Sequence, residues 1–270
     1  EFMNGSVLER HFDLSRPEDF RAYSEHPVKL SEPTKVLFPR GLSALESKTK
    51  TIRMKLNPEG YWMFGGGVDM KGVPGDADMA PVRDSRIDWS SSPAKVQNDL
   101  ILIPATGIKG AIAHRVAFHY KALNNRFADG QSQDVLKKWA KENEAVLALF
   151  GYCKDKDDDG QRGRIIINDM FVAENPPQQL VHHVGIDRFT GGARDSVLFC
   201  ERPFWRGMEL ELEINVVEAD QIKDSSIWEA FHRALNDLAN GQLQVGAGAG
   251  RGNGYFKGEL QWPDGLGTEG

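Results

Sequence analysis

The chain has 270 residues, of which 40% are hydrophobic and 27% charged, a composition typical of a globular protein with one large domain or two small ones. No apolar run approaches the roughly 18 residues that cross a bilayer, and the first residues do not resemble a signal peptide, so we expect a cytoplasmic protein with no membrane partner and reduced thiols. The formal net charge of −6 argues against an extended basic surface for nucleic acid, although basic residues recur near glycine-rich and strand-end segments.

Polar, proline-punctuated sequence fills residues 1–47, which we interpret as an N-terminal extension or linker. The first three residues, "EFM", look like a remnant of cloning. The character of the sequence then changes, and residues 48–270 are predicted to form a single domain. Alternation in "KTKTIRMKL" (48–56) predicts a strand. Residues 65–99 are rich in Gly, Asp, Ser and Pro and are expected to form a long functional loop.

Two helical segments are predicted next. Apolar residues four positions apart predict a helix over 106–123 that begins at Thr106. A second helix is predicted over 134–150, and Gly151 would end it.

The second half of the chain is predicted to contain several strands and one more helix. The helix covers 225–240, with Ser226 and Glu229 in capping-box register and Gly241 as its stop. This order predicts an α+β fold of the split βαβ, ferredoxin-like (RRM-like) kind, with one sheet, helices on one face and long loops that carry function. The predicted strands are 163–172, 182–188, 196–204, 208–217 and 254–262.

Glycine occupies every second position in "VGAGAGRGNG" (245–254), which suggests a loop whose backbone N–H groups approach an anion. A Rossmann loop would follow the first strand and open a helix, whereas this loop follows a predicted helix and opens a strand. No Walker A motif occurs in the chain either. The "DKDDDG" segment (155–160) fits the first positions of a calcium loop, but Ile166 stands where a glutamate is required, so a solvated acidic turn is favoured.

Four stretches of the chain carry recognisable motifs: "IPATGIKGAIAHR" (103–115), "GIDRFTGGA" (185–193), "LFCERPFWRGMELELEI" (198–214) and "GAGAGRGNGYF" (246–256). Together and in this order they resemble the RAMP superfamily of CRISPR-associated proteins, whose backbone subunits line the guide RNA of type III effector complexes. The fold that this resemblance implies is ferredoxin-like, in agreement with the pattern of elements.

The resemblance implies that the chain binds guide RNA beside other type III subunits. Each predicted contact has a structural alternative: the glycines could serve a tight turn alone, Arg115 a surface ion pair, Phe189 the core, and Asp187 could hold Arg188 by a salt bridge. Lys109 would add to the positive end of a helix dipole, Phe189 could stack on bases, and Arg251 is the expected direct phosphate contact. The candidate RNA-binding residues are Lys109, Arg115, Arg188, Phe189, Thr190, Gly248, Gly250, Arg251 and Gly252.

The resemblance also suggests cleavage of complementary target RNA. In catalytic members of the family, an aspartate just upstream of the segment that 103–115 resembles cuts with a divalent metal. Here "GDADMAPVRDS" (75–85) offers Asp78, with Asp76 as its competitor. Asp78 would hold Mg²⁺ or take the 2′-OH proton, and Lys109 would stabilise charge on the phosphate. One alternative is a non-catalytic structural subunit. Another is a metal-free guide-processing nuclease that uses His114 or His119.

Overall fold

The structure, a computed structural model, describes residues 12, 14, 16–25, 49–67, 77–88, 90, 94–153 and 160–266. The chain divides into two compact units, one made of residues 1–47 with 88–95 and the other of residues 48–87 with 96–270. In the first unit, α1 (Pro17–Ser24) begins with a proline and carries Glu18 and Asp19 in its first turn, where negative charge suits the helix dipole. The second unit holds all the sites discussed below.

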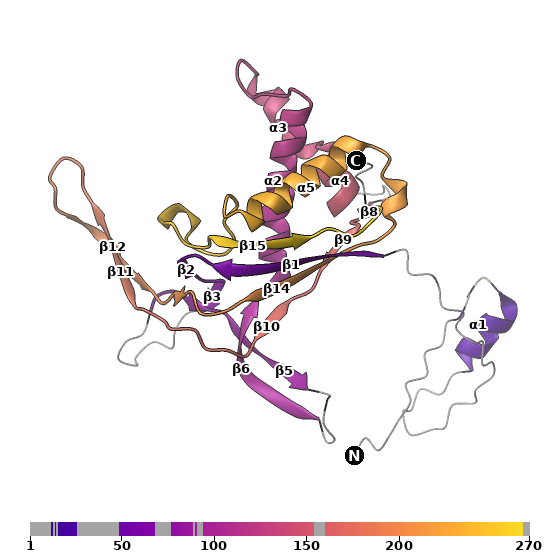
Figure 1. The fold of residues 1–270 in the computed structure, drawn as a ribbon, viewed down its shortest axis with the longest axis horizontal. Coiled ribbons are helices and arrows are strands. Elements are labelled where there is room, and N and C mark those ends of the chain that lie inside the picture. Colours follow the sequence, from indigo (N-terminus) through magenta and orange to yellow (C-terminus); the bar gives the residue numbers. More distant parts are fainter. Residues whose placement is uncertain are drawn as a thin grey trace. The chain divides into compact units, whose positions relative to one another are not determined.

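A four-stranded antiparallel sheet forms the centre of the second unit (Figure 1). Its strands lie in the order β15–β1–β14–β9. Strand β1 therefore pairs with β14 and β15, two strands near the other end of the chain. Burial alternates along β1 and β14, as the sequence pattern of 48–56 and 208–217 predicts, because successive side chains point to opposite faces. The strands are β1 (Lys50–Pro58), β9 (Ile165–Ile167), β14 (Leu210–Val216) and β15 (Phe256–Gln261).

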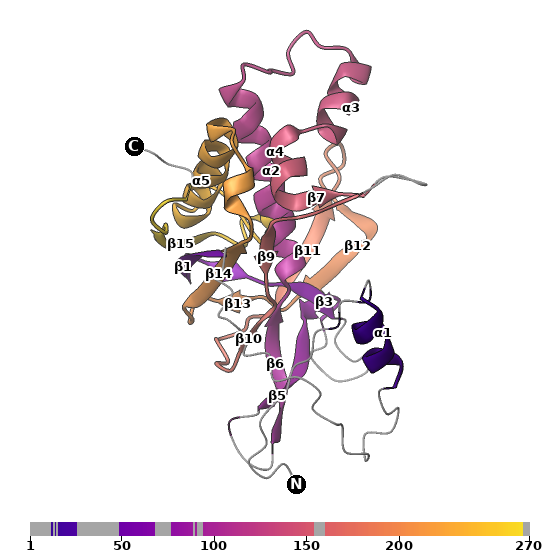
Figure 2. The same cartoon turned by 90° about the vertical axis from the view of Figure 1, so that its right-hand side faces the viewer.

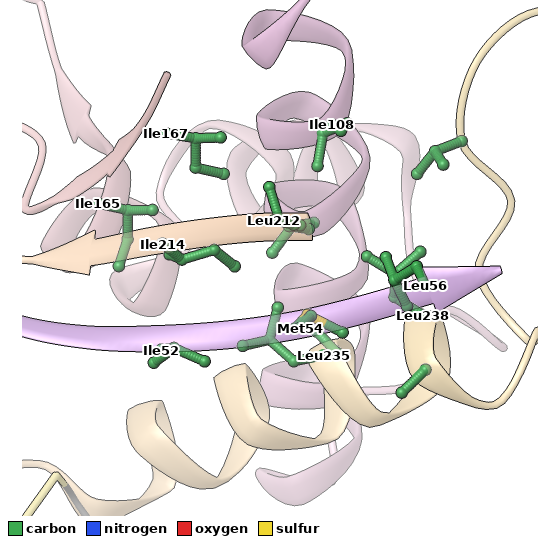
Figure 3. Close-up of a cluster of buried hydrophobic side chains, with 14 of the residues drawn as sticks. Ile52, Met54, Leu56, Ile108, Ile165, Ile167, Leu212, Ile214, Leu235 and Leu238 are labelled. Carbon is green, nitrogen blue, oxygen red and sulfur yellow. The ribbon is translucent and has the colours of Figure 1, made fainter. Parts of the chain in front are cut away.

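Helices cover one face of this sheet, as expected. The helices α2 (Ala105–Leu123), α4 (Glu144–Phe150) and α5 (Ser225–Ala239) lie on the same side of the strands in both ribbon views (Figures 1 and 2). Apolar side chains of β1, β9 and β14 meet those of α2 and α5 in one core (Figure 3). Burial of this area supplies the main favourable term for folding. The drawn and labelled core residues are Ile52, Met54, Leu56, Ile108, Ile165, Ile167, Leu212, Ile214, Leu235 and Leu238.

The other face of the sheet carries charged side chains paired across strands. Arg53 contacts Glu213 at 2.9 Å, and Lys55 lies 3.4 Å from Glu211. These side chains are more than half exposed, and no aromatic side chain lies among the outward positions of β1 and β14. This face therefore has none of the aromatic side chains on which an RRM stacks bases.

Short strands fill much of the segment expected as a long loop over 65–99, so that expectation was wrong over 77–88 and 94–99. The chain there pairs with itself and, through β6 (Lys95–Ile103), with the later strand β10 (Met170–Val172), which satisfies many of its backbone groups. Residues 68–76 lie outside the described part. The strands between β1 and α2 are β2 (Tyr61–Trp62), β3 (Gly65–Gly67), β4 (Ala80–Pro81), β5 (Arg83–Asp88) and β6 (Lys95–Ile103).

The remaining strands form small antiparallel pairs. The longest pair, β11 (Val181–Ile186) with β12 (Ala193–Glu201), is a hairpin that extends away from the four-stranded sheet (Figure 1). The predicted strand over 163–172 is divided into β9 and a separate β10, which pairs with β6 instead. The other strands are β7 (Gly151–Tyr152), β8 (Gln161–Arg162), β10 (Met170–Val172) and β13 (Phe204–Trp205).

Helix ends differ from the sequence predictions at three places. The predicted helix over 134–150 is two helices, α3 (Gln133–Lys141) and α4, because the Asn143 side chain accepts a bond from Val146 N and starts α4 anew. Helix α2 begins at Ala105 rather than Thr106, and the Ala105 N–H donates to the Asp169 carboxylate. The cap of α5 is Asp224, not Ser226.

None of the helices in the described ranges combines the length and apolar character that a bilayer span requires. The expected mixture of helices and antiparallel strands is confirmed.

Candidate nucleic-acid interface

The tip of the β11–β12 hairpin is a turn that Asp187 organises. Its Oδ1 accepts hydrogen bonds from Phe189 N and Thr190 N, each at 2.9 Å, and from Thr190 Oγ1 at 3.2 Å. These bonds lower the pKa of Asp187, because they favour the charged carboxylate. The predicted role for Asp187, a salt bridge to Arg188, is replaced by this use of the carboxylate within the turn. Phe189 is 99% exposed, so the alternative in which it fills the core is wrong.

Apolar and basic side chains share the exposed surface of this hairpin. Val184, Ile186 and Leu198 are each more than half exposed, which is unusual for aliphatic residues on adjacent strands. Arg188 and Arg194 are exposed near the turn. The hairpin thus offers an aromatic tip with positive charge beside it, the side-chain types that contact single-stranded nucleic acid.

At the base of the hairpin, Glu201 is almost fully buried, with 1% of its surface exposed. Its Oε1 accepts from His183 Nε2 at 3.0 Å and from Asn253 Nδ2 at 3.2 Å, and its Oε2 accepts from Arg251 Nη2. Burial raises the pKa of Glu201, but the hydrogen bonds from Arg251 and His183 lower it, and the net pKa is below the ordinary value. Glu201 is therefore a charged, fully bonded carboxylate.

The Arg251 guanidinium also lies over the Phe199 ring, 5.4 Å from its centre, and the His183 ring stacks on the same phenyl at 4.7 Å. A cation over an aromatic face is attracted by the ring quadrupole. Arg251 is thus held both by Glu201 and by Phe199. Its Nε and Nη2 atoms bond Glu201, which leaves the N–H groups of Nη1 as donors for a ligand.

The glycine-rich segment forms a compact loop around a short 3₁₀ turn, Ala249–Arg251. At Gly254, φ is +81° and an added Cβ would lie 2.1 Å from Val245 O, so the fold itself requires glycine there. Gly250 is different: its φ is not positive, and nothing lies within 4 Å of the Cβ position. The other positive-φ glycines of the loop are Gly246, Gly248 and Gly252.

Asp78 is held against the end of β12. Its Oδ2 accepts from Cys200 N at 2.8 Å and lies 3.4 Å from Cys200 Sγ. Met79 forms a parallel bridge to Glu201, with Met79 N donating to Cys200 O and Arg202 N donating to Met79 O. The segment with the candidate catalytic residue therefore adjoins the residue that contacts the glycine-rich loop. Asp76 lies outside the described residues.

The described residues do not build a cage for a metal ion. Within those ranges, no group of three or more His, Cys, Asp or Glu side chains is close enough to hold one. In the candidate cleavage segment, the carboxylate of Asp78 would be a single metal ligand from the protein. One such ligand suits a Mg²⁺ ion that keeps most of its water ligands. The acidic residues 155–159 of the candidate calcium loop lie outside the described part.

The candidate residues on α2 bond to their own surroundings. Lys109 Nζ donates to Ile165 O at 2.8 Å and is half buried, which leaves two of its three N–H donors for other partners. Arg115 Nε lies 3.3 Å from Asp237 Oδ2, the ion pair that was the alternative to RNA contact. His119 Nε2 is 2.8 Å from the same carboxylate oxygen, whereas His114 is exposed. His119 is therefore paired with a carboxylate, whereas His114 faces solvent.

A family model described as the RAMP superfamily matches residues 58–257 of this chain. The match covers more than half of the sequence, including all four stretches that suggested the family. The chain belongs to the RAMP superfamily. No individual curated protein matches it. Membership of the RAMP superfamily implies a CRISPR-associated role in RNA binding, within assemblies of several subunits.

Sequence reasoning missed Glu201 and its bonds to three side chains: His183, Arg251 and Asn253. Glu201 stands inside the quoted stretch 198–214, and a glutamate directly after the apolar run Leu198–Cys200 was the available signal. Its partner Arg251 is 50 positions away in the chain, so no local pattern could have paired them.

Proposed function

We propose that this RAMP protein is a guide-RNA-binding backbone subunit of a type III CRISPR effector complex. The observation that carries the proposal is the aromatic tip of the β11–β12 hairpin, where Phe189 is 99% exposed on a turn fixed by Asp187. An aromatic ring held in solvent is costly for folding but is suited to stacking on a nucleobase. Arg188 and Thr190 precede and follow Phe189 and are exposed, and we propose that they contact the adjoining phosphates.

The four-stranded sheet supports a ferredoxin-like, split βαβ assignment. Strand β1 is followed by α2 before β9, and β14 is followed by α5 before β15. The order β15–β1–β14–β9 interleaves these two units, and α2 and α5 pack on the same face. In contrast to an RRM, however, the open face carries ion pairs such as Arg53–Glu213. RNA binding is therefore assigned to the hairpin and the loops.

The second RNA contact that we propose is the glycine-rich loop. Gly248, Gly250 and Gly252 keep the backbone free of side chains on both sides of Arg251, whose Nη1 can donate to a phosphate. We also propose that Lys109 and Arg115 contact the RNA, but more weakly than Arg251. Lys109 retains two donors beyond its bond to Ile165 O, whereas Arg115 is already engaged with Asp237.

For the catalytic function, we propose that Asp78 cleaves complementary target RNA in the assembled complex. When bound, Mg²⁺ would offset negative charge on the scissile phosphate. Asp78 is positioned by Cys200 N and would act as a metal ligand or accept the proton of the attacking 2′-OH. In-line placement of that hydroxyl supplies much of the acceleration. Lys109 and Asp76 remain proposed catalytic residues. The alternative function is a structural subunit that binds guide RNA without cutting.

The test uses the reconstituted complex with labelled target RNA paired to its guide, in Mg²⁺ or EDTA, with wild type, Asp78→Asn and Asp84→Asn. Asp84 is an exposed carboxylate of the same segment and serves as the matched control. We expect cuts to disappear with EDTA and with Asp78→Asn, and to persist with Asp84→Asn, while guide binding is unchanged in all three. Cutting by Asp78→Asn at the wild-type rate would refute the catalytic assignment. Cutting that persists in EDTA would favour the metal-free nuclease.

A further inference from the structure

We propose that Glu201 is a positioning residue, whose buried carboxylate fixes the hairpin, the glycine-rich loop and Arg251 in the geometry that binds RNA. This inference rests on the proposed RNA-binding function. Glu201 contacts neither Phe189 nor the Nη1 atom that is free to donate. It would act through the groups that it holds.

The carboxylate joins segments that are far apart in the sequence. His183 belongs to β11, Glu201 to β12, and Arg251 and Asn253 to the glycine-rich loop. One buried side chain thus connects the two elements to which RNA binding is assigned. Its backbone neighbours also hold Asp78 and Met79, so the candidate cleavage segment is attached at the same place.

The bonding pattern fixes the direction of the guanidinium. Glu201 takes the Nε–Nη2 edge of Arg251, and the ring of Phe199 lies against its face. A planar guanidinium held at one edge and one face has one orientation, so its remaining donors are fixed as well. Arg251 is 35% exposed at its side chain, whereas Glu201 is 1% exposed. The negative charge is buried and the positive group reaches solvent.

The proposal predicts the direction in which RNA affinity changes when the negative charge of Glu201 is removed. Removal of a negative charge near an RNA site should, from Coulomb's law alone, strengthen RNA binding. If Glu201 positions Arg251 and the loop, its removal should weaken binding instead. The direction of the change therefore separates positioning from simple charge.

The experiment compares the full-length protein with Glu201→Gln and with Glu211→Gln, an exposed glutamate of β14 paired with Lys55 on the open face of the sheet. Binding of a single-stranded guide RNA is measured across a range of salt concentrations. We expect Glu211→Gln to bind as tightly as wild type or slightly more tightly. Glu201→Gln should bind at least about tenfold more weakly, because a charge-assisted bond and its orientation are lost. Equal or tighter binding by Glu201→Gln would overturn the proposal.

A double-mutant comparison distinguishes positioning of Arg251 from general loss of structure. Arg251→Gln should weaken RNA binding and reduce the slope of log K against log salt by about 0.7, as for one phosphate contact on a single strand. Adding Glu201→Gln to Arg251→Gln should then weaken binding by a smaller factor than Glu201→Gln does alone, because no guanidinium remains to be held and only the bonds to His183 and Asn253 are lost. Independent losses that multiply in the double variant would overturn the proposal.

Two further measurements test the positioning role if Glu201→Gln folds poorly or if the wild-type protein does not bind guide RNA. His183→Gln removes one outer bond and leaves the Arg251 pair, and it should weaken RNA binding less than Glu201→Gln does. Amide hydrogen exchange of the RNA-free protein should accelerate over residues 181–201 and 245–254 in Glu201→Gln. If wild type fails to bind guide RNA yet exchange accelerates, the proposed function fails and the positioning of both elements stands. Unchanged exchange in Glu201→Gln would refute the positioning itself.

Discussion

The substitution Gly250→Ala should make the protein more stable and weaken its binding to RNA at the same time. Gly250 lies in the 3₁₀ turn Ala249–Arg251, without positive φ and with no atom within 4 Å of the Cβ position. Alanine fits this backbone, so the substitution should raise the free energy of unfolding by about 0.4–1 kcal/mol through the unfolded chain. Fold packing gives no reason for glycine at this position, which leaves close approach of a ligand as the reason that we propose.

Gly254→Ala is the matched control, because the same methyl group is added in the same loop. There φ is +81° and the new Cβ would lie 2.1 Å from Val245 O, so the cost should exceed the roughly 1–2 kcal/mol of a left-handed alanine. Thermal unfolding should show a Tm lower by several degrees for Gly254→Ala, at about 2–4 °C per kcal/mol, and a Tm slightly higher for Gly250→Ala.

RNA binding is then measured for Gly250→Ala by filter binding at fixed salt. A bond between a loop N–H and a charged phosphate contributes about 1.5–3 kcal/mol, so its loss should weaken binding about ten- to a hundredfold. Unchanged affinity would show that RNA does not approach Gly250. A Tm that falls as far as that of Gly254→Ala would show that the fold does require glycine there.

The other predictions concern the hairpin tip, the buried carboxylate and a helix cap. Phe189→Ala should leave Tm unchanged because the ring is 99% exposed, yet should cost about 1–3 kcal/mol of RNA binding; a lower Tm would place the ring in the core after all. The pKa of Glu201 is below its ordinary value of 4.5, so its charge stabilises the fold above that value and the contribution is lost as pH falls below it. Urea unfolding should therefore show a difference in the free energy of unfolding between wild type and Glu201→Gln at pH 7 that narrows as the pH falls below 4.5, and a difference independent of pH would contradict this. Asp224→Ala should lower the free energy of unfolding by about 1 kcal/mol, because Asp224 Oδ1 caps α5 at Ser226 N, and calorimetry that shows no loss of Tm would refute this role.

The parts of the fold that follow from local pattern were predictable. The four-residue spacing in α2 placed Ile108, Ile112, Val116 and Tyr120 on one face, and all four are buried. The alternation in 208–217 gave the buried and exposed faces of β14. Helix starts were less predictable, because several residues near one another could cap. At α5 the sequence pattern indicated Ser226, whereas the carboxylate of Asp224, which precedes the first turn, makes the capping bond to Ser226 N.

The candidate site was predictable as a set of segments but not as an arrangement. The motifs identified the hairpin turn, the glycine-rich loop and the Asp78 segment, each from its own residues. Their convergence on β12 depends on bonds between distant positions, such as Asp78 to Cys200 and Arg251 to Glu201. Such bonds are specified by the packing of the whole domain, which local periodicity does not describe.

The turn at the hairpin tip has a consequence for the rate at which the protein captures RNA. Its three bonds to Asp187 are formed within the protein alone, so the loop does not need to be ordered when a ligand arrives. Ordering a flexible loop costs entropy on every encounter, and a turn that is already formed avoids most of that cost. A larger share of collisions with RNA should then be productive, since the backbone that carries Phe189 is already in place. Selectivity among guides would depend more on how long each one stays bound than on how fast it arrives.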